Sequence, residues 1–129
     1  MADLARHPLI AFEEGMSRHR TVSWFKEVAP GATYPARNSS VLGLIYAAKA
    51  GVGVAPLPVS LGDAEADLVR VIGPVPELTR AWRILTHPDQ RHTARIAAFF
   101  DFVLLEMDAL RPILTGLDVR RVAVAFSTT

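Results

Sequence analysis

Hydrophobic residues in the first half of the chain fall into short blocks separated by turn residues. The blocks at 8–12 and 52–55 are continuous and apolar, which is typical of strands covered on both faces. Apolar residues at helical spacing predict a helix over 18–29, and residues 33–37 are predicted to form a brief strand. With a second helix before 52–55, this order predicts an α/β fold, with a mixed, mostly parallel sheet and flanking helices.

The stretch that organises this pattern begins at Asn38, Ser39 and Ser40. Side chains of these types accept hydrogen bonds from the first turn of a helix, so they predict a helix start. Residues 41–50 are apolar nearly all round, with one lysine, which predicts a buried helix. Gly51 can supply the left-handed conformation that commonly ends a helix. The start of this helix is therefore the first candidate for binding a negative ligand.

The second half of the chain carries a different pattern. Residues 59–67 are predicted to form a short helical turn, and 68–72 and 81–86 to form strands. From residue 87 a last helix is expected, and its apolar stripe needs a wide partner surface. The stripe consists of Ile96, Phe99, Phe100, Val103, Leu104 and Met107.

Composition limits the possible functions. The chain has 129 residues, half of them hydrophobic, and a net charge of +1. A charge this small gives no electrostatic footprint for nucleic acid. There is no cysteine, no secretory signal and no apolar run long enough to cross a membrane. We therefore expect a soluble, cytoplasmic protein that does not bind a membrane.

Several segments together resemble a known family. The runs DLARHPLIAFEEG, AAKAGVGVAPLP, DLVRVIG and AWRILTHPDQRHTARIAAFFDFV occur in the order and spacing of LysR-type transcriptional regulators. They resemble the C-terminal part of the effector-binding domain, over residues 3–115. The resemblance rests on the whole series, since each motif alone is common.

The resemblance implies one lobe of a fold like the type 2 periplasmic binding proteins, plus a returning strand and a C-terminal helix. Residues 1–80 would form the second lobe, 81–116 the strand and helix that return to the first lobe, and 117–129 a disordered tail or an edge strand. The helix-turn-helix and most of lobe one have no counterpart in these residues. DNA contact is therefore expected only through that N-terminal domain of an intact regulator.

The family also implies a small anionic metabolite as effector, bound in the cleft between lobes. Asn38, Ser39 and Ser40 would bind its carboxylate, although simple helix capping explains the same residues equally well. Ser17 and Arg18, in the loop after the first strand, and the segment from Gly53 to Pro56 are second choices for contacts with the effector. The full predicted set of effector-binding residues is Asn38, Ser39, Ser40, Ser17, Arg18, Gly53 and Pro56.

No metal site, cofactor or catalytic group is predicted. His87 and His92 lie five residues apart across a proline turn, without a carboxylate at ligand spacing. Gly51-Val52-Gly53 lacks the third glycine of a dinucleotide fingerprint, and no nucleophile elbow is present. We therefore expect a non-enzymatic protein.

Two aromatic residues and one helix bear on packing and assembly. Trp24 and Trp82 are expected in the core, because each lies among apolar neighbours.

In the resembled family two chains pack side by side, so a homo-oligomer is expected. The helix near 21–28 is the candidate contact, with core burial as the alternative explanation.

Two other classes of function are alternatives at the level of the sequence. One is a solute-binding lobe of a transport-associated periplasmic-type protein. The other is a small enzyme that uses Ser39 and Ser40 as an oxyanion site, for which no base lies at a suitable spacing. The effector-sensing part of a LysR-type regulator accounts for more of the sequence than either.

Overall fold

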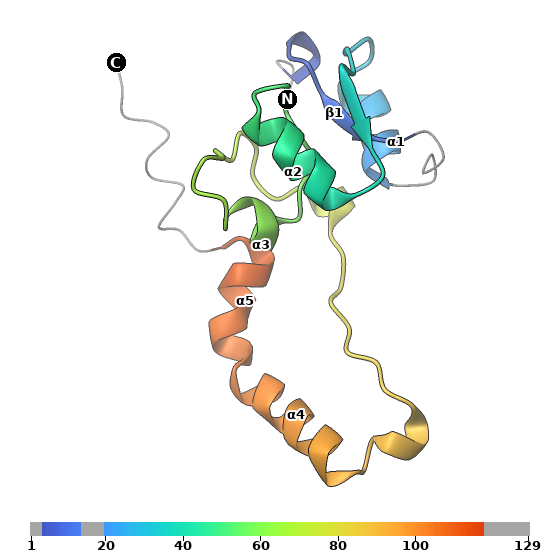
Figure 1. Ribbon diagram of the computed structural model, residues 1–129, viewed down its shortest axis with the longest axis vertical. Helices are drawn as coiled ribbons and strands as arrows, with labels where there is room; N and C mark the ends of the chain where they lie inside the picture. The colour runs from blue at the N-terminus through green and yellow to red at the C-terminus, as the bar shows by residue number, and fades with distance from the viewer. Residues whose placement is uncertain (1–3, 14–19, 118–129) are drawn as a thin grey trace. The chain divides into compact units, whose positions relative to one another are not determined.

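The structure is a computed structural model that describes residues 4–13 and 20–117. The chain divides between Gly73 and Pro74 into two compact units. The first unit contains a small parallel sheet with helices, and the second contains an extended segment followed by two helices (Figure 1). The predicted α/β fold with parallel strands is confirmed.

The sheet of the first unit is organised around β1 (Ile10–Phe12), which pairs in parallel with β2 (Ala36–Asn38). On the other side of β1, Leu9 forms a parallel bridge with Val54. The predicted strand at 8–12 is therefore present. The one predicted at 33–37 begins later, and that at 52–55 is reduced to a single bridge.

Backbone hydrogen bonds hold β1 on both sides. The Ile10 N–H donates to the Val54 carbonyl at 2.8 Å, and the Val54 N–H donates to the Pro8 carbonyl at 2.9 Å. Toward β2, the Glu13 N–H donates to the Asn38 carbonyl at 3.2 Å. All three residues of β1 are buried, as expected for the central strand of a parallel sheet.

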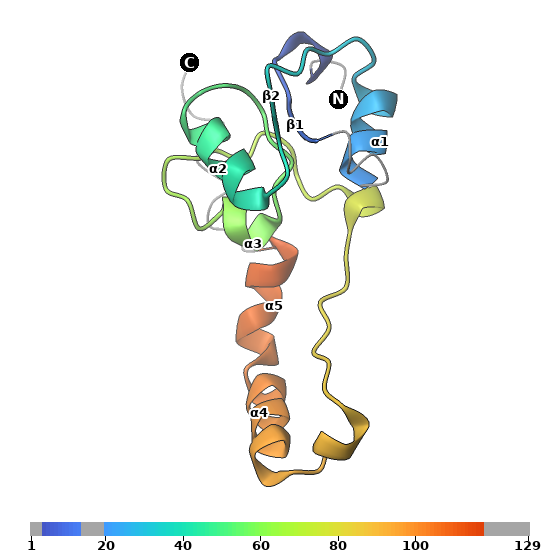
Figure 2. The same ribbon diagram turned by 45° about the vertical axis from the view of Figure 1, so that its right-hand side comes forward.

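The described part of the first unit also contains three α-helices, and Figure 2 shows them around the strands. They are α1 (Arg20–Val28), α2 (Val41–Lys49) and α3 (Val59–Gly62), after a short 3-10 helix, η1 (Leu4–Arg6). The predicted helices at 18–29 and 41–50 are confirmed, apart from residues 18 and 19, which lie outside the described residues. The helical turn predicted within 59–67 is present as α3, at the start of that range.

The core of the first unit joins both longer helices to β1. Ile10, Phe12, Val22 and Leu44 form one buried cluster, and residues such as Leu57 pack against it. Trp24 is also buried, as predicted. Each fully buried apolar side chain of this size contributes about 1.5–3 kcal/mol to folding.

The prediction that α2 is buried on all sides is wrong. Leu44 and Ile45 are buried, but Leu42 is 63% exposed and Tyr46 is 68% exposed. Leu44 joins the core cluster, with Val41, Ala47 and Ala48 packed against that cluster, so the helix buries one face. Gly51, which follows α2, has a φ of +75° and ends the helix as predicted.

Gly53 allows the closest approach of the backbone to β1. A Cβ built on Gly53 would overlap the backbone carbonyl oxygen of Pro8. The second glycine of the Gly51-Val52-Gly53 turn is therefore required sterically, so that Val54 can pair with Leu9.

Ion pairs position the segment that follows α3. Lys49, at the C-terminal end of α2, contacts Glu65 Oε2 through its Nζ at 2.7 Å and Asp67 Oδ2 at 3.2 Å. The Arg70 guanidinium pairs with the Asp63 carboxylate. Residues 68–72 alternate in burial as predicted, but they form no strand, because no sheet edge bonds to their backbone within the described part of the chain.

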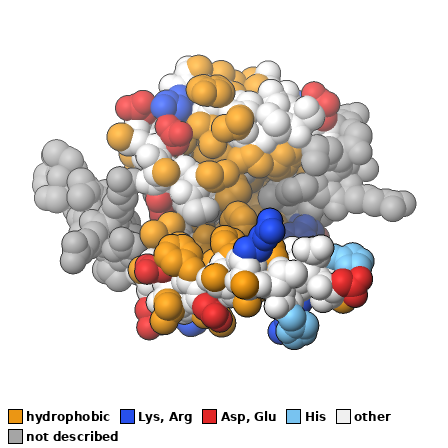
Figure 3. Space-filling view, turned by 60° about the horizontal axis from the view of Figure 1, so that its bottom comes forward, with side chains coloured by type: hydrophobic (Ala, Val, Ile, Leu, Met, Phe, Trp, Pro, Cys, Tyr) orange, Lys and Arg blue, Asp and Glu red, His pale blue; other side chains and the backbone are white. Residues whose placement is uncertain are grey.

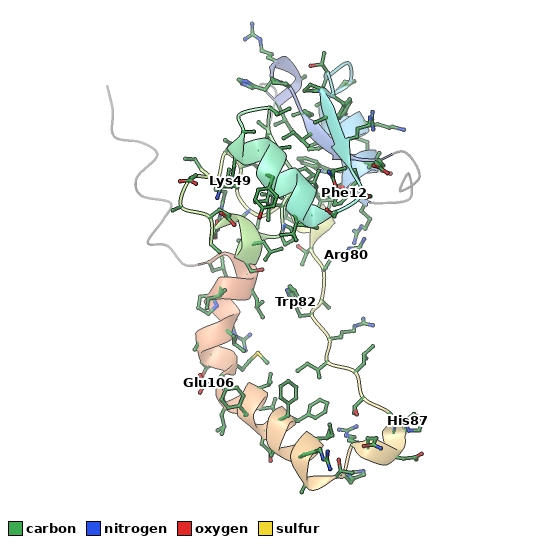
Figure 4. The ribbon with its side chains drawn as sticks, viewed as in Figure 1. Phe12, Lys49, Arg80, Trp82, His87 and Glu106 are labelled. Carbon is green, nitrogen blue, oxygen red and sulfur yellow. The ribbon has the colours of Figure 1, made fainter. Side chains whose placement is uncertain are left out.

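The second unit begins with η3 (Pro76–Leu78) and continues as an extended segment to η4 (Pro88–Gln90). The strand predicted at 81–86 is absent from the described residues, because its backbone has no neighbouring strand. Trp82, labelled in Figure 4, is 70% exposed, so its prediction as a core residue is wrong.

The last predicted helix is divided in two. It forms α4 (Ala94–Leu105) and α5 (Met107–Thr115), with Glu106 at the break. No hydrophobic side chain in the described residues from 74 to 117 is buried. Among the described helices of both units, none combines the length and the apolar character needed to cross a membrane.

We expect Gly53→Ala to lower the free energy of unfolding by about 2 kcal/mol, because the new methyl group collides with backbone that cannot move freely. Gly73→Ala is the matched control, since a Cβ there meets nothing within 4 Å, and it should change stability by less than about 0.5 kcal/mol. Urea unfolding of both variants measures the difference. Equal stabilities would contradict the close approach to Pro8.

The ion pairs of Lys49 with Glu65 and Asp67 predict that the stability of the fold depends on pH. Hydrogen bonds to Glu65 and then to Asp67 raise the pKa of Lys49 above its usual value of 10.5. A raised pKa in the folded state stabilises the protein below the unfolded pKa, and this contribution disappears as pH rises through the folded pKa. Lys49→Met should therefore lower Tm at pH 8, and its difference from the unsubstituted chain should shrink above pH 10.5. Lys26→Met, outside this cluster, controls for lost charge, and a pH-independent difference would argue against the ion pairs.

Candidate functional site

The candidate site lies where the carboxyl ends of β1 and β2 meet the N-terminus of α2. Phe12 and Asn38 are paired in the register, and each is the last residue of its strand. Ser40 begins α2 only two residues after Asn38. In open α/β sheets, ligands bind beyond the carboxyl ends of the strands, so this edge is the natural place for one.

Asn38 and Ser40 are joined by local hydrogen bonds. The Asn38 Oδ1 accepts from the Ser40 backbone N–H at 3.0 Å and from the Ser40 hydroxyl at 3.2 Å. The Ser40 Oγ in turn accepts from the Gly43 N–H at 3.1 Å, which is the predicted N-cap bond. A Cβ at position 43 would overlap the Asn38 side chain, so any larger residue there would displace that side chain.

This cap leaves donors open toward solvent. Within the part of the chain that the structure describes, the backbone N–H groups of Val41 and Leu42 donate to no other group. Ser39 is exposed, and its hydroxyl has no partner among the same residues. The positive end of the α2 dipole acts at the same point, so the local field favours a negative ligand.

Arg37 is a functional candidate that the sequence interpretation missed. Its Nη1 donates to the carbonyl of Phe12 at 3.4 Å, at the end of β1. Its guanidinium carbon lies 4.9 Å from the centre of the Tyr34 ring. A signal was available, because Arg37 directly precedes Asn38 in the chain. Glu13 follows β1 at the same edge, so the edge carries charges of both signs.

The other residues predicted to bind the effector do not lie at this edge in the described structure. Gly53 lies against Pro8, at the opposite end of β1 from Asn38. Pro56 is half-buried between Ala55 and Leu57, which pack against the core cluster. The structure therefore brings Asn38, Ser39 and Ser40 together and leaves Gly53 apart from them. Ser17 and Arg18 lie outside the described residues.

The described polar groups at this edge are hydrogen-bond donors and acceptors from Asn38, Ser39 and Ser40. The Ser40 hydroxyl donates to an amide oxygen, which cannot remove its proton, so Ser40 is not an activated nucleophile. No cluster of three or more metal-ligating side chains occurs in residues 4–13 and 20–117. Hydroxyl and amide donors beside a helix N-terminus bind an anion without transforming it.

Comparison with known proteins identifies the family of the chain. A family model described as the LysR substrate binding domain matches residues 1–108. No curated protein and no solved structure matches the chain. Because the family model covers most of the sequence, the resemblance noted from its motifs is confirmed, and the chain belongs to the LysR substrate-binding-domain family.

Proposed function

We propose that this chain is the effector-sensing part of a LysR-family transcriptional regulator and that it binds a small anionic metabolite at the N-terminus of α2. The observation that carries the proposal is the pair of open N–H groups of Val41 and Leu42 beside the exposed hydroxyl of Ser39. All three donors lie at the edge where two parallel strands end.

The ligand is assigned as an anion on electrostatic grounds. The positive end of the α2 dipole and the guanidinium of Arg37 act on the same edge, beside the carboxylate of Glu13. A carboxylate accepts several N–H and O–H bonds at once, which matches the donors present. Asn38 contributes indirectly, because it fixes the Ser40 cap and thereby the first turn of α2.

The function requires binding alone. In an intact regulator the effector would favour one arrangement of the DNA-bound oligomer, by the difference in its affinity for the two arrangements. DNA contact would be made by the N-terminal domain of that regulator, and the regulator would act in the cytoplasm.

Binding is tested with a panel of small mono- and dicarboxylates, each compared with its neutral amide. A carboxylate that binds should raise Tm, while the amide should not. Ser39→Ala should weaken binding about tenfold, because it removes a hydrogen bond to a charged group. Ser23→Ala, an exposed serine on α1, is the matched control. Equal affinities of the Ser39→Ala and Ser23→Ala chains would refute this site.

Ser40 should behave differently from Ser39. Ser40→Ala removes the N-cap bond to Gly43 and should lower the free energy of unfolding by about 1 kcal/mol. Ser40→Thr keeps a hydroxyl cap and should recover most of this loss. Ser39→Ala should leave stability within about 0.5 kcal/mol of the starting value. Urea unfolding in the absence of ligand distinguishes the three variants.

A further inference from the structure

Glu13 joins the candidate site from the first strand. It directly follows β1, and its N–H donates to the Asn38 carbonyl at 3.2 Å. Glu13 is exposed, so its carboxylate is accessible to a solute. This acid therefore lies at the edge of the sheet where the start of α2 presents the donors of the proposed anion site.

The Glu13 carboxylate has no protein partner of opposite charge in the described part of the chain. The acids between residues 63 and 67 pair there with Lys49 or Arg70, but no such pair includes Glu13. Figure 3 shows acidic and basic side chains, in red and blue, side by side on one face of the molecule. The described residues thus leave the charge of Glu13 without a counterion.

Arg37 brings a positive charge to the same edge without neutralising Glu13. Its Nη1 donates to the Phe12 carbonyl at 3.4 Å, and its guanidinium carbon lies 4.9 Å from the centre of the Tyr34 ring. Within residues 4–13 and 20–117 the guanidinium forms no ion pair. The edge therefore offers an acid, a base and the positive end of a helix dipole to a ligand.

These three charges match a ligand with one positive and two negative groups. A simple carboxylate at the start of α2 would meet the like charge of Glu13 at the same edge, which lowers its affinity. An ammonium group beside that carboxylate would instead pair with Glu13, and a second carboxylate would pair with Arg37. An α-amino acid carries its ammonium and carboxylate groups on one carbon, so both can reach this edge.

We infer that the effector is an acidic amino acid, with its ammonium group on the Glu13 carboxylate and its side-chain carboxylate on the Arg37 guanidinium. The inference rests on the proposed function, because the α-carboxylate takes the donors at the start of α2. Glu13 then determines specificity, since it favours amino acids over acids of the same length that lack the amine.

The test titrates the full chain with L-glutamate and with two probes that each lack one charged group. Glutarate lacks the ammonium group, and L-glutamine lacks the second carboxylate. L-Aspartate, succinate and L-asparagine repeat the comparison one methylene shorter. In the length that binds tighter, the acidic amino acid should bind at least about tenfold tighter than either probe, because each probe loses a hydrogen bond between charged groups. Isothermal titration calorimetry measures the affinities.

Two variants assign the two preferences to single residues. Glu13→Gln should abolish the preference for the amine without weakening binding of the diacid, because the amide carries no charge. Arg37→Gln should abolish the preference for the second carboxylate and keep the preference for the amine. Glu27→Gln, an exposed acid on α1, is the matched control and should change neither. All three positions are exposed, so each variant should keep its far-UV circular dichroism.

The outcomes separate this inference from the proposed function. If the diacid binds and the amino acid binds no tighter, the anion site stands and the role of Glu13 is refuted. An amine preference that survives Glu13→Gln would likewise refute it, since another group would then hold the ammonium. If no carboxylate binds at all, the proposed function fails and the inference fails with it.

Discussion

The first unit depends on the hydrogen bonding of β1 along both of its edges. This strand has only three residues, yet it is buried throughout, and its backbone groups bond to β2 on one side and to Val54 on the other. Satisfying these groups allows the strand to be buried, because an unpaired backbone group in the core costs about 1–3 kcal/mol. The close contact at Gly53 and the packing of α2 both follow from this arrangement.

The candidate site is a consequence of the same arrangement. Parallel pairing brings Phe12 and Asn38 to one edge, and the chain turns directly into α2 after Asn38. The turn uses the Asn38 and Ser40 side chains for the cap, and among the described residues Ser39 and the N–H groups of Val41 and Leu42 have no partner. One local turn thus caps the helix and presents the donors on which the proposed anion site rests.

The second unit shows what happens to apolar sequence without a sheet. Residues 81–86 have the composition of a strand, but a strand is stabilised by its neighbours, and none lies beside this segment in the described residues. Helices bond within themselves, so α4 and α5 form even though their apolar side chains are not buried. Residues 81–86 and the two helices therefore differ because a strand needs hydrogen bonds from a distant segment, whereas a helix forms its hydrogen bonds locally.

The sequence by itself determined α1, α2, the cap of α2 and the family. The serine cap of α2, the stop at Gly51 and the parallel strand order could all be read from local residue chemistry. Tertiary structure decided which predicted strands find partners, the exposure of Leu42, Tyr46 and Trp82, and the placement of Arg37 against Phe12. These features depend on contacts between residues far apart in the chain, which local patterns do not specify.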